Sequence, residues 1–178
     1  MIDFPMAVSA VRQLLCAIGE NPDRPGLLDT PKRVAKFYDE WINGDPGQMT
    51  AFEEQTDSMV VVSGIETWSL CEHHMLPFRL VLNIGYIPSG KLLGLSKFGR
   101  IAHHAAHRLQ VQERLVDQIA KAVMEATGTT SVGVCSSGEH LCTLIRGIRT
   151  ASTMRVNALR GQFRDNPAVR QEFLDLTR

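Results

Sequence analysis

Two short segments, Cys71-Glu72-His73-His74 and His140-Leu141-Cys142, bring together residue types that bind metal ions. The chain has four cysteines and six histidines, and five of these ten residues lie in the two segments. Thiolate and imidazole are ligands that zinc selects. Cys71 and His74 are three residues apart, so a single turn can direct both side chains to one point. The spacing therefore predicts a metal site.

The second segment offers one further ligand, or two. His140 and Cys142 are two residues apart, so an extended strand would place both on one face. Two thiolates and one imidazole suffice for an open site, whereas a closed structural site usually has four ligands. An open site keeps a position for water, whose pKa a bound zinc lowers to about 7. His73 and His140 would then remain as proton carriers, with ordinary pKa values of about 6.5.

Basic side chains near these segments suggest an anionic substrate. In an extended strand, Arg146 would share the face of His140 and Cys142 and could grip an anion there. Lys97 and Arg100 are three residues apart at the start of an expected helix, and helix N-termini favour anions. For each charge on its own, a solvated surface is the better explanation. Together, beside a metal, they indicate a phosphorylated substrate.

A second group of histidines, His103, His104 and His107, contains a pair spaced by four residues on an expected helix. Such a pair can bind metal on a helix face. The group has no nearby cysteine, and it lacks the glutamate of the H-E-x-x-H motif. We therefore expect histidines of the surface or of an interface.

Composition places the chain among ordinary globular proteins. Charged residues make up 21%, and 19 basic side chains balance 19 acidic ones, so nothing points to a nucleic acid or a membrane as partner. No apolar run approaches the ~20 residues needed to span a bilayer. The N-terminal residues show no export signal. Four cysteines, arranged in part like zinc ligands, lead us to expect a reducing, cytoplasmic location.

The hydrophobic pattern predicts an α+β fold with antiparallel strands and long inserted helices. Helices are expected over residues 5–18, 32–41, 96–109 and 112–127, with a short one starting at 166. Strands are expected from 59 towards 71, over 78–86, over 131–135, and from 140 through 148. A loop is expected over 44–55.

Six runs of sequence resemble the GTP cyclohydrolase I family. They keep the order and spacing of that family and extend from about residue 20 to the end of the chain. The runs are Leu27-Leu28-Asp29-Thr30-Pro31-Lys32-Arg33-Val34-Ala35, Cys71-Glu72-His73-His74-Met75-Leu76-Pro77-Phe78, Gly94-Leu95-Ser96-Lys97, Gln110-Val111-Gln112-Glu113-Arg114-Leu115, His140-Leu141-Cys142 and Arg146-Gly147-Ile148.

The resemblance implies a role for each residue of the site. Zinc would be bound by Cys71, His74 and Cys142, and His73 and His140 would be the catalytic acid–base pair. Glu113, helped by Gln112, would hold the edge of guanine, because a carboxylate accepts two hydrogen bonds at once. The residues implied to bind the triphosphate are Ser96, Lys97, Arg100, Arg146 and, from a neighbouring subunit, Arg33 and Lys36.

The resemblance also implies a reaction and a fold. Zinc-activated hydroxide would attack C8 of GTP, which opens the imidazole ring and releases formate. Ring closure would give 7,8-dihydroneopterin triphosphate, the first step of tetrahydrofolate and pterin biosynthesis. The implied architecture is the tunnelling fold (T-fold), an antiparallel sheet with long helices on one side and a barrel completed across subunits. The family usually forms a homo-oligomer, a decamer of two pentamers with shared active sites.

Residues 1–178 are thus predicted to form a single GTP cyclohydrolase I domain, with N-terminal helices over 1–45 and a catalytic core over 57–178. Two other functions are compatible with this pattern. A deazaguanine nitrile reductase on the same fold would use NADPH and a nucleophilic cysteine, but the retained zinc ligands, histidines and Glu113 argue against it. A zinc module used only for assembly would not need His73 or His140. Iron could replace zinc, whereas thiolate ligands disfavour manganese.

Overall fold

The computed structural model describes residues 2–44 and 47–178, and the chain divides into two compact units, 1–45 and 46–178. The predicted organisation, one domain with N-terminal helices over 1–45 and a core over 57–178, stays a prediction. Residues 45–46, which fall in the loop predicted over 44–55, lie outside the described residues.

The first unit is a pair of packed helices, α1 (Phe4–Ala17) and α2 (Thr30–Ile42). α1 begins where the Asp3 carboxylate accepts a hydrogen bond from the backbone N–H of Met6 at 2.9 Å. This bond satisfies one of the donors that a helix N-terminus leaves open, and a proline fits the first turn of each helix. The helices predicted over 5–18 and 32–41 are confirmed.

The second unit contains a five-stranded sheet in the order β5-β2-β3-β6-β7 and a separate pair, β1-β4. β2–β3, β3–β6 and β6–β7 are antiparallel, and the short β5 pairs in parallel with the end of β2. The strands are β1 (Ala51–Glu53), β2 (Val60–Cys71), β3 (Pro77–Tyr86), β4 (Lys91–Leu93), β5 (Leu109–Gln110), β6 (Val132–His140) and β7 (Thr153–Leu159).

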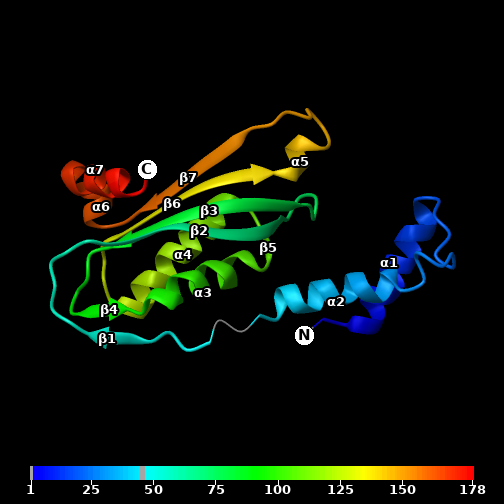
Figure 1. Cartoon of the computed structure of the whole chain (residues 1–178), viewed down its shortest axis with the longest axis horizontal. Helices are drawn as coiled ribbons and strands as arrows, with labels where there is room; N and C mark the ends of the chain where they lie inside the picture. The colour runs from blue at the N-terminus through cyan, green and yellow to red at the C-terminus, as the bar shows by residue number, and fades with distance from the viewer. Residues whose placement is uncertain (1, 45–46) are drawn as a thin grey trace. The chain divides into compact units, whose positions relative to one another are not determined.

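Two long helices, α3 (Leu95–Ala106) and α4 (Gln112–Thr127), cover one face of this sheet (Figure 1). α4 buries Leu115, Ile119 and Val123, which are spaced by one helical turn. Alternate residues of β3 face the same core, namely Phe78, Leu80, Leu82, Ile84 and Tyr86, and all are fully buried. Each such side chain contributes about 1.5–3 kcal/mol through burial.

The opposite face of the sheet is partly covered by α6 (Gln162–Asp165) and α7 (Pro167–Leu176) near the C-terminus. Their aromatic rings, Phe163 and Phe173, lie against Gly85 of β3 and Gly133 of β6. A Cβ at Gly133 would come within 2.5 Å of a Phe163 ring carbon, so glycine is required for this close approach.

The structure confirms the predicted α+β class, with an antiparallel sheet and long helices on one side. Closure of a barrel across subunits concerns an assembly and stays a prediction. The strand predicted from 140 through 148 is wrong, because β6 ends at His140 and the short helix α5 (Leu141–Leu144) follows. Strands β1, β4, β5 and β7 were not predicted. β1 lies inside the loop predicted over 44–55, and the helix predicted over 96–109 ends at Ala106, before β5. Within the described residues, no helix is both long enough and apolar enough to cross a membrane.

Candidate metal centre and active site

The tight connection between β2 and β3 positions Cys71 and His74. Cys71 is the buried last residue of β2, and its N–H donates to the Leu76 carbonyl at 2.8 Å. The N–H of Met75 donates a hydrogen bond to the Cys71 carbonyl at 2.7 Å, which closes the turn. Met75 has φ 55°, a left-handed conformation that is uncommon for a residue other than glycine. This turn directs the side chains at both of its ends towards one point.

Cys142 reaches the same point from a different element. β6 ends at His140, and the chain then turns into α5, where the Thr143 hydroxyl donates to the His140 carbonyl at 3.0 Å. The prediction that His140, Cys142 and Arg146 share one face of an extended strand is therefore wrong. A helical turn, not a strand, carries the cysteine.

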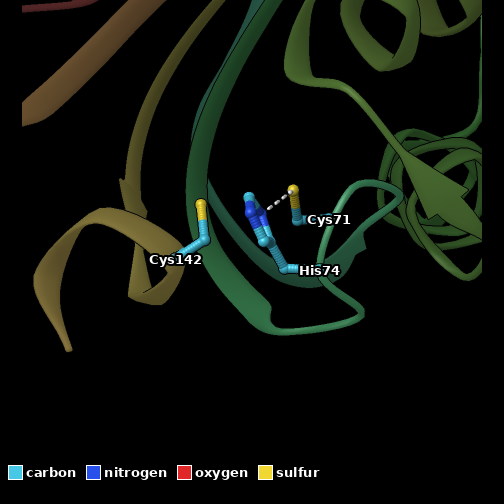
Figure 2. Close-up of side chains that lie close together, drawn as sticks. All are labelled: Cys71, His74 and Cys142. Atoms are coloured by element: carbon cyan, nitrogen blue, oxygen red, sulfur yellow. Dashed lines mark hydrogen bonds between the residues drawn. The ribbon is translucent and has the colours of Figure 1, made fainter. Parts of the chain in front are cut away.

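Cys71, His74 and Cys142 form the candidate metal centre. One ligand atom from each, two sulfurs and one imidazole nitrogen, lies within 4.8 Å of the other two. Figure 2 shows the three side chains gathered at this point. Over residues 2–44 and 47–178, this is the only such group of three or more Cys, His, Asp or Glu residues. Two soft thiolates and one imidazole suit zinc better than a hard cation.

The two thiols also favour a cation between them. Burial raises the pKa of Cys142, and the proximity of Cys71 raises it further, whereas Arg146 lowers it. Without a cation, the Cys142 thiol therefore resists ionisation. A bound ion would hold both as thiolates and release their protons.

The two adjacent histidines differ in their relation to this centre. The Nδ1 atoms of His73 and His74 both lie 3.9 Å from Cys71 Sγ, so the distance to Cys71 does not separate them. Only His74 also lies within range of Cys142. The Nε2 of His73 instead lies 4.0 Å from Glu72 Oε1, and its side chain is 64% exposed.

His140 lies beside the centre in a more enclosed place. Its ring stacks on Phe78 with a centroid separation of 4.4 Å and an interplanar angle of 7°. Its Nε2 lies 2.9 Å from Oε1 of Gln112 in α4. Burial lowers the pKa of His140, and the Glu113 carboxylate partly offsets this. The imidazole is therefore held in a fixed orientation and favours its neutral form.

Gln112 and Glu113 begin α4 but have different surroundings. Gln112 is 1% exposed, and its Nε2 donates to Ser136 Oγ at 2.8 Å and to the Met154 carbonyl at 3.1 Å. With Oε1 on His140, the whole amide is engaged. Glu113 is exposed in the first helical turn, so its carboxylate is accessible to a ligand. A guanine contact by the Gln112 side chain would require these bonds to change.

The predicted triphosphate ligands lie in three places. Ser96, Lys97 and Arg100 are in the first two turns of α3, and the Arg100 guanidinium lies against Gly47. Arg146 contacts Nε2 of His74. The remaining two, Arg33 and Lys36, are in the separate N-terminal unit, where Arg33 lies 3.5 Å from Asp29 and Lys36 lies 3.5 Å from Glu40. Their part in a site shared between subunits stays a prediction.

A polar network next to His73 was missed by sequence reasoning. The Glu72 carboxylate forms an ion pair with Arg114, whose Nε donates to Gln110 Oε1 at 2.8 Å. Gln110 in turn donates to Gln118 Oε1 at 2.7 Å. The sequence offered one signal for this network, the position of Glu72 inside the metal-binding motif. No sequence pattern indicated that Arg114, 42 residues away, would be its partner.

The fold and the site together define an α+β protein with a Cys-His-Cys cluster that could hold a metal ion and with two further histidines beside it. The chain belongs to the GTP cyclohydrolase I family, whose family model matches residues 7–178. It is 47% identical over 170 residues to GTP cyclohydrolase 1 of Pseudoalteromonas translucida, with 92% of each chain covered. It is also 47% identical over 182 residues to GTP cyclohydrolase 1 of Mycolicibacterium gilvum, with 98% of this chain and 90% of that protein covered.

Two solved structures show a weaker likeness. An archaeosine synthase QueF-Like in the apo form matches 58% of this chain and 96% of its own, with a TM-score of 0.44 and 16% identity. A dihydroneopterin aldolase from Burkholderia bound to guanine matches 58% of this chain and 92% of its own, with a TM-score of 0.36 and 12% identity.

Proposed function

We propose that this protein hydrolyses GTP at C8 of the guanine ring, releases formate and forms 7,8-dihydroneopterin triphosphate, which enters pterin and folate biosynthesis. The observation that carries the proposal is the Cys71, His74 and Cys142 group with His140 held beside it, in a chain of the GTP cyclohydrolase I family. Three ligands leave a coordination position open for water, as hydrolysis requires.

Zinc is the proposed metal. The convergence of two sulfurs and one nitrogen supports this choice, because thiolates favour zinc over magnesium, calcium or manganese. When bound, the ion would supply Lewis-acid activation of a water for attack on C8. A metal on Nδ1 of His74 would require a proton on Nε2, which could no longer accept a hydrogen bond from Arg146.

His140 is proposed as the main proton carrier, with His73 as its counterpart. The Gln112 Oε1 can only accept, so Nε2 of His140 carries a proton and Nδ1 keeps a free lone pair. The lowered pKa keeps this lone pair available at neutral pH. His73 is exposed and close to Glu72, so it can exchange protons with solvent.

Substrate binding is proposed to use both ends of the ligand. The Glu113 carboxylate would accept hydrogen bonds from the N–H groups of the guanine edge, and the N-terminus of α4 stabilises its charge. Ser96 and Lys97 at the N-terminus of α3, with Arg100, would bind phosphate oxygens. Arg146 contacts His74 beside the metal centre, whereas α3 begins at the other end of β3, where the Leu93 N–H donates to the Tyr86 hydroxyl. The two groups of basic residues would therefore act on one substrate only in a site shared between subunits.

We further propose a homo-oligomer, with a decamer of two pentamers as the expected form. Two features support assembly. β7 is an edge strand, and β2 is an edge strand along residues 60–69, because β5 pairs only with Leu70 and Cys71. Such long free edges favour pairing with another copy. The first unit also exposes apolar side chains, including Met6 at 66% and Ile18 at 65%. A cytoplasmic location is proposed because reduced thiols are required for the ligands.

The test is to supply GTP to the purified, zinc-loaded protein and to measure formate and oxidised, fluorescent pterin in the same sample as bound zinc. We expect formate and pterin in equal amounts. Cys142→Ser should lose zinc and turnover, whereas His140→Ala should keep zinc and lose turnover. Zinc-replete protein that releases no formate would overturn the proposal.

A further inference from the structure

The histidine group on α3 lies outside the site described above. His103 and His107 are one turn apart, and their ring centroids are separated by 5.6 Å with an interplanar angle of 51°. Metal–nitrogen bonds of about 2.1 Å and tetrahedral angles place the centroids of two rings that share one ion about 5–6 Å apart. The pair therefore already has the separation that a shared ion requires.

A second element fixes one of the two rings. α3 packs over β2, and the Thr67 hydroxyl of β2 lies 3.0 Å from Nδ1 of His103. Thr67 is 2% exposed, so this oxygen is held in place by the sheet. Histidines that bind metals commonly direct the second ring nitrogen to an oxygen that fixes their orientation. Thr67 supplies this partner and leaves Nε2 of His103 for an ion.

The surroundings favour ligands in their neutral, metal-binding form. Burial lowers the pKa of His107, and the nearby His103 and His104 lower it further. His104 itself lines a separate cavity of about 460 Å³ between α3 and α4, together with Ile101 and Ala122. His104 therefore faces this cavity, whereas His103 faces Thr67 of β2.

We propose that His103 and His107 form a second metal site that takes a divalent transition metal such as Cu²⁺, Ni²⁺ or Zn²⁺ through one nitrogen of each ring, with His103 oriented by Thr67. Two imidazoles with the remaining positions open to water make this site weaker than the Cys71, His74 and Cys142 centre. It contains no thiolate, so its preference follows the general order in which Cu²⁺ binds more tightly than Ni²⁺ or Zn²⁺. The proposal is independent of GTP hydrolysis.

The test is a titration of the zinc-loaded, full-length protein with Ni²⁺ alone, followed by calorimetry and by elemental analysis of both metals after dialysis. We expect one additional Ni²⁺ per chain while the original zinc is retained. His103→Gln and His107→Gln should each abolish the additional equivalent. His104→Gln, which changes the neighbouring histidine outside the pair, should retain it.

The role of the Thr67 hydroxyl is tested by comparing two substitutions at that position. Thr67→Val should weaken Ni²⁺ binding by about 10- to 100-fold, whereas Thr67→Ser, which keeps the hydroxyl, should bind like the unchanged protein. Circular dichroism establishes that each variant is folded. Unchanged Ni²⁺ binding in His103→Gln, or loss in His104→Gln, would overturn the proposal. GTP turnover measured on the same samples separates this result from any failure of the proposed enzymatic function.

Discussion

Gln112 Oε1 accepts a hydrogen bond from Nε2 of His140 at 2.9 Å, across the junction between the start of α4 and the end of β6. The same amide anchors to Ser136 and to the Met154 carbonyl, so the first residue of a helix ties two neighbouring strands to the candidate catalytic histidine. This arrangement selects one tautomer of His140 and holds its ring parallel to Phe78.

Gln112→Glu should alter the pH dependence of turnover. The substitution keeps an acceptor opposite His140 but adds a negative charge, which stabilises the imidazolium and raises its pKa by about one unit or more. The acidic limb of kcat/KM should move to higher pH, with turnover at pH 6 lowered about tenfold. pH–rate profiles measure this, with Ser136→Ala as control, because it removes one partner of Gln112 but not the bond to His140. An unchanged profile would show that Gln112 does not control His140.

Stability should fall at mildly acidic pH. The pKa values of His140 and His107 are both lowered by burial, so below about pH 6.5 the unfolded chain binds more protons than the folded protein. The contribution of these two histidines to the free energy of unfolding should therefore be fully present above about pH 6.5. It should be lost as the pH falls below that value. Urea denaturation at pH 7 and pH 5.5 measures the loss, and His107→Gln should reduce it. An equal loss in His107→Gln would exclude His107 as a contributor.

Met75 should tolerate glycine but not a β-branched residue. Its φ of 55° closes the turn between Cys71 and Leu76, and this conformation is strongly disfavoured for valine. Met75→Val should lower the free energy of unfolding by about 1–3 kcal/mol and weaken zinc binding, because the turn positions two ligands. Met75→Gly should retain zinc affinity. Chelator competition on the two variants measures the difference, and equal zinc affinities would show that the turn does not control the centre.

Much of the fold could be predicted from the sequence, because the patterns that indicate its helices and strands are local. α4 was predicted over its observed residues, since Leu115, Ile119 and Val123 recur at helical spacing. β3 followed from alternation on one buried face. The chain after His140 was not accessible in this way, because the short apolar run in α5 fits a strand or a helical turn equally well. Positive φ values at Gly147 and Arg149 then keep the chain from remaining extended.

The site could be predicted from the sequence only in part, because only some of its contacts are local. Spacing within one turn was enough to pair Cys71 with His74, and the structure places their ligand atoms together with that of Cys142. Contacts between distant elements left no local signal. The stack of Phe78 on His140 depends on strand register, and the Glu72–Arg114 ion pair depends on the position of α4 against β2.

Gly133→Ala should destabilise the protein through a clash on the sheet face covered by α6 and α7. The added methyl group would lie 2.5 Å from a Phe163 ring carbon and 3.0 Å from a Phe173 ring carbon, which is closer than packed atoms allow. The expected cost is about 1–3 kcal/mol. Gly99→Ala in α3 is the matched control, because a Cβ there meets no atom within 4 Å and alanine favours a helix by about 1 kcal/mol. Chemical denaturation of both variants gives the comparison, and equal stabilities would contradict the predicted clash.

Oxidation should join Cys71 to Cys142 faster in the metal-free protein than in the zinc-loaded protein. Cys71 and Cys142 place their sulfur atoms within 4.8 Å of each other, so a small movement of α5 allows a disulfide between them. Bound zinc would hold both thiolates as ligands and block that reaction. Treatment with diamide, followed by thiol counting and zinc analysis, should show one disulfide per chain without zinc and protection with it. Cys135→Ser, which removes a half-buried thiol outside the group, should behave like the unchanged protein. Equal oxidation rates with and without zinc would show that these cysteines do not bind the ion.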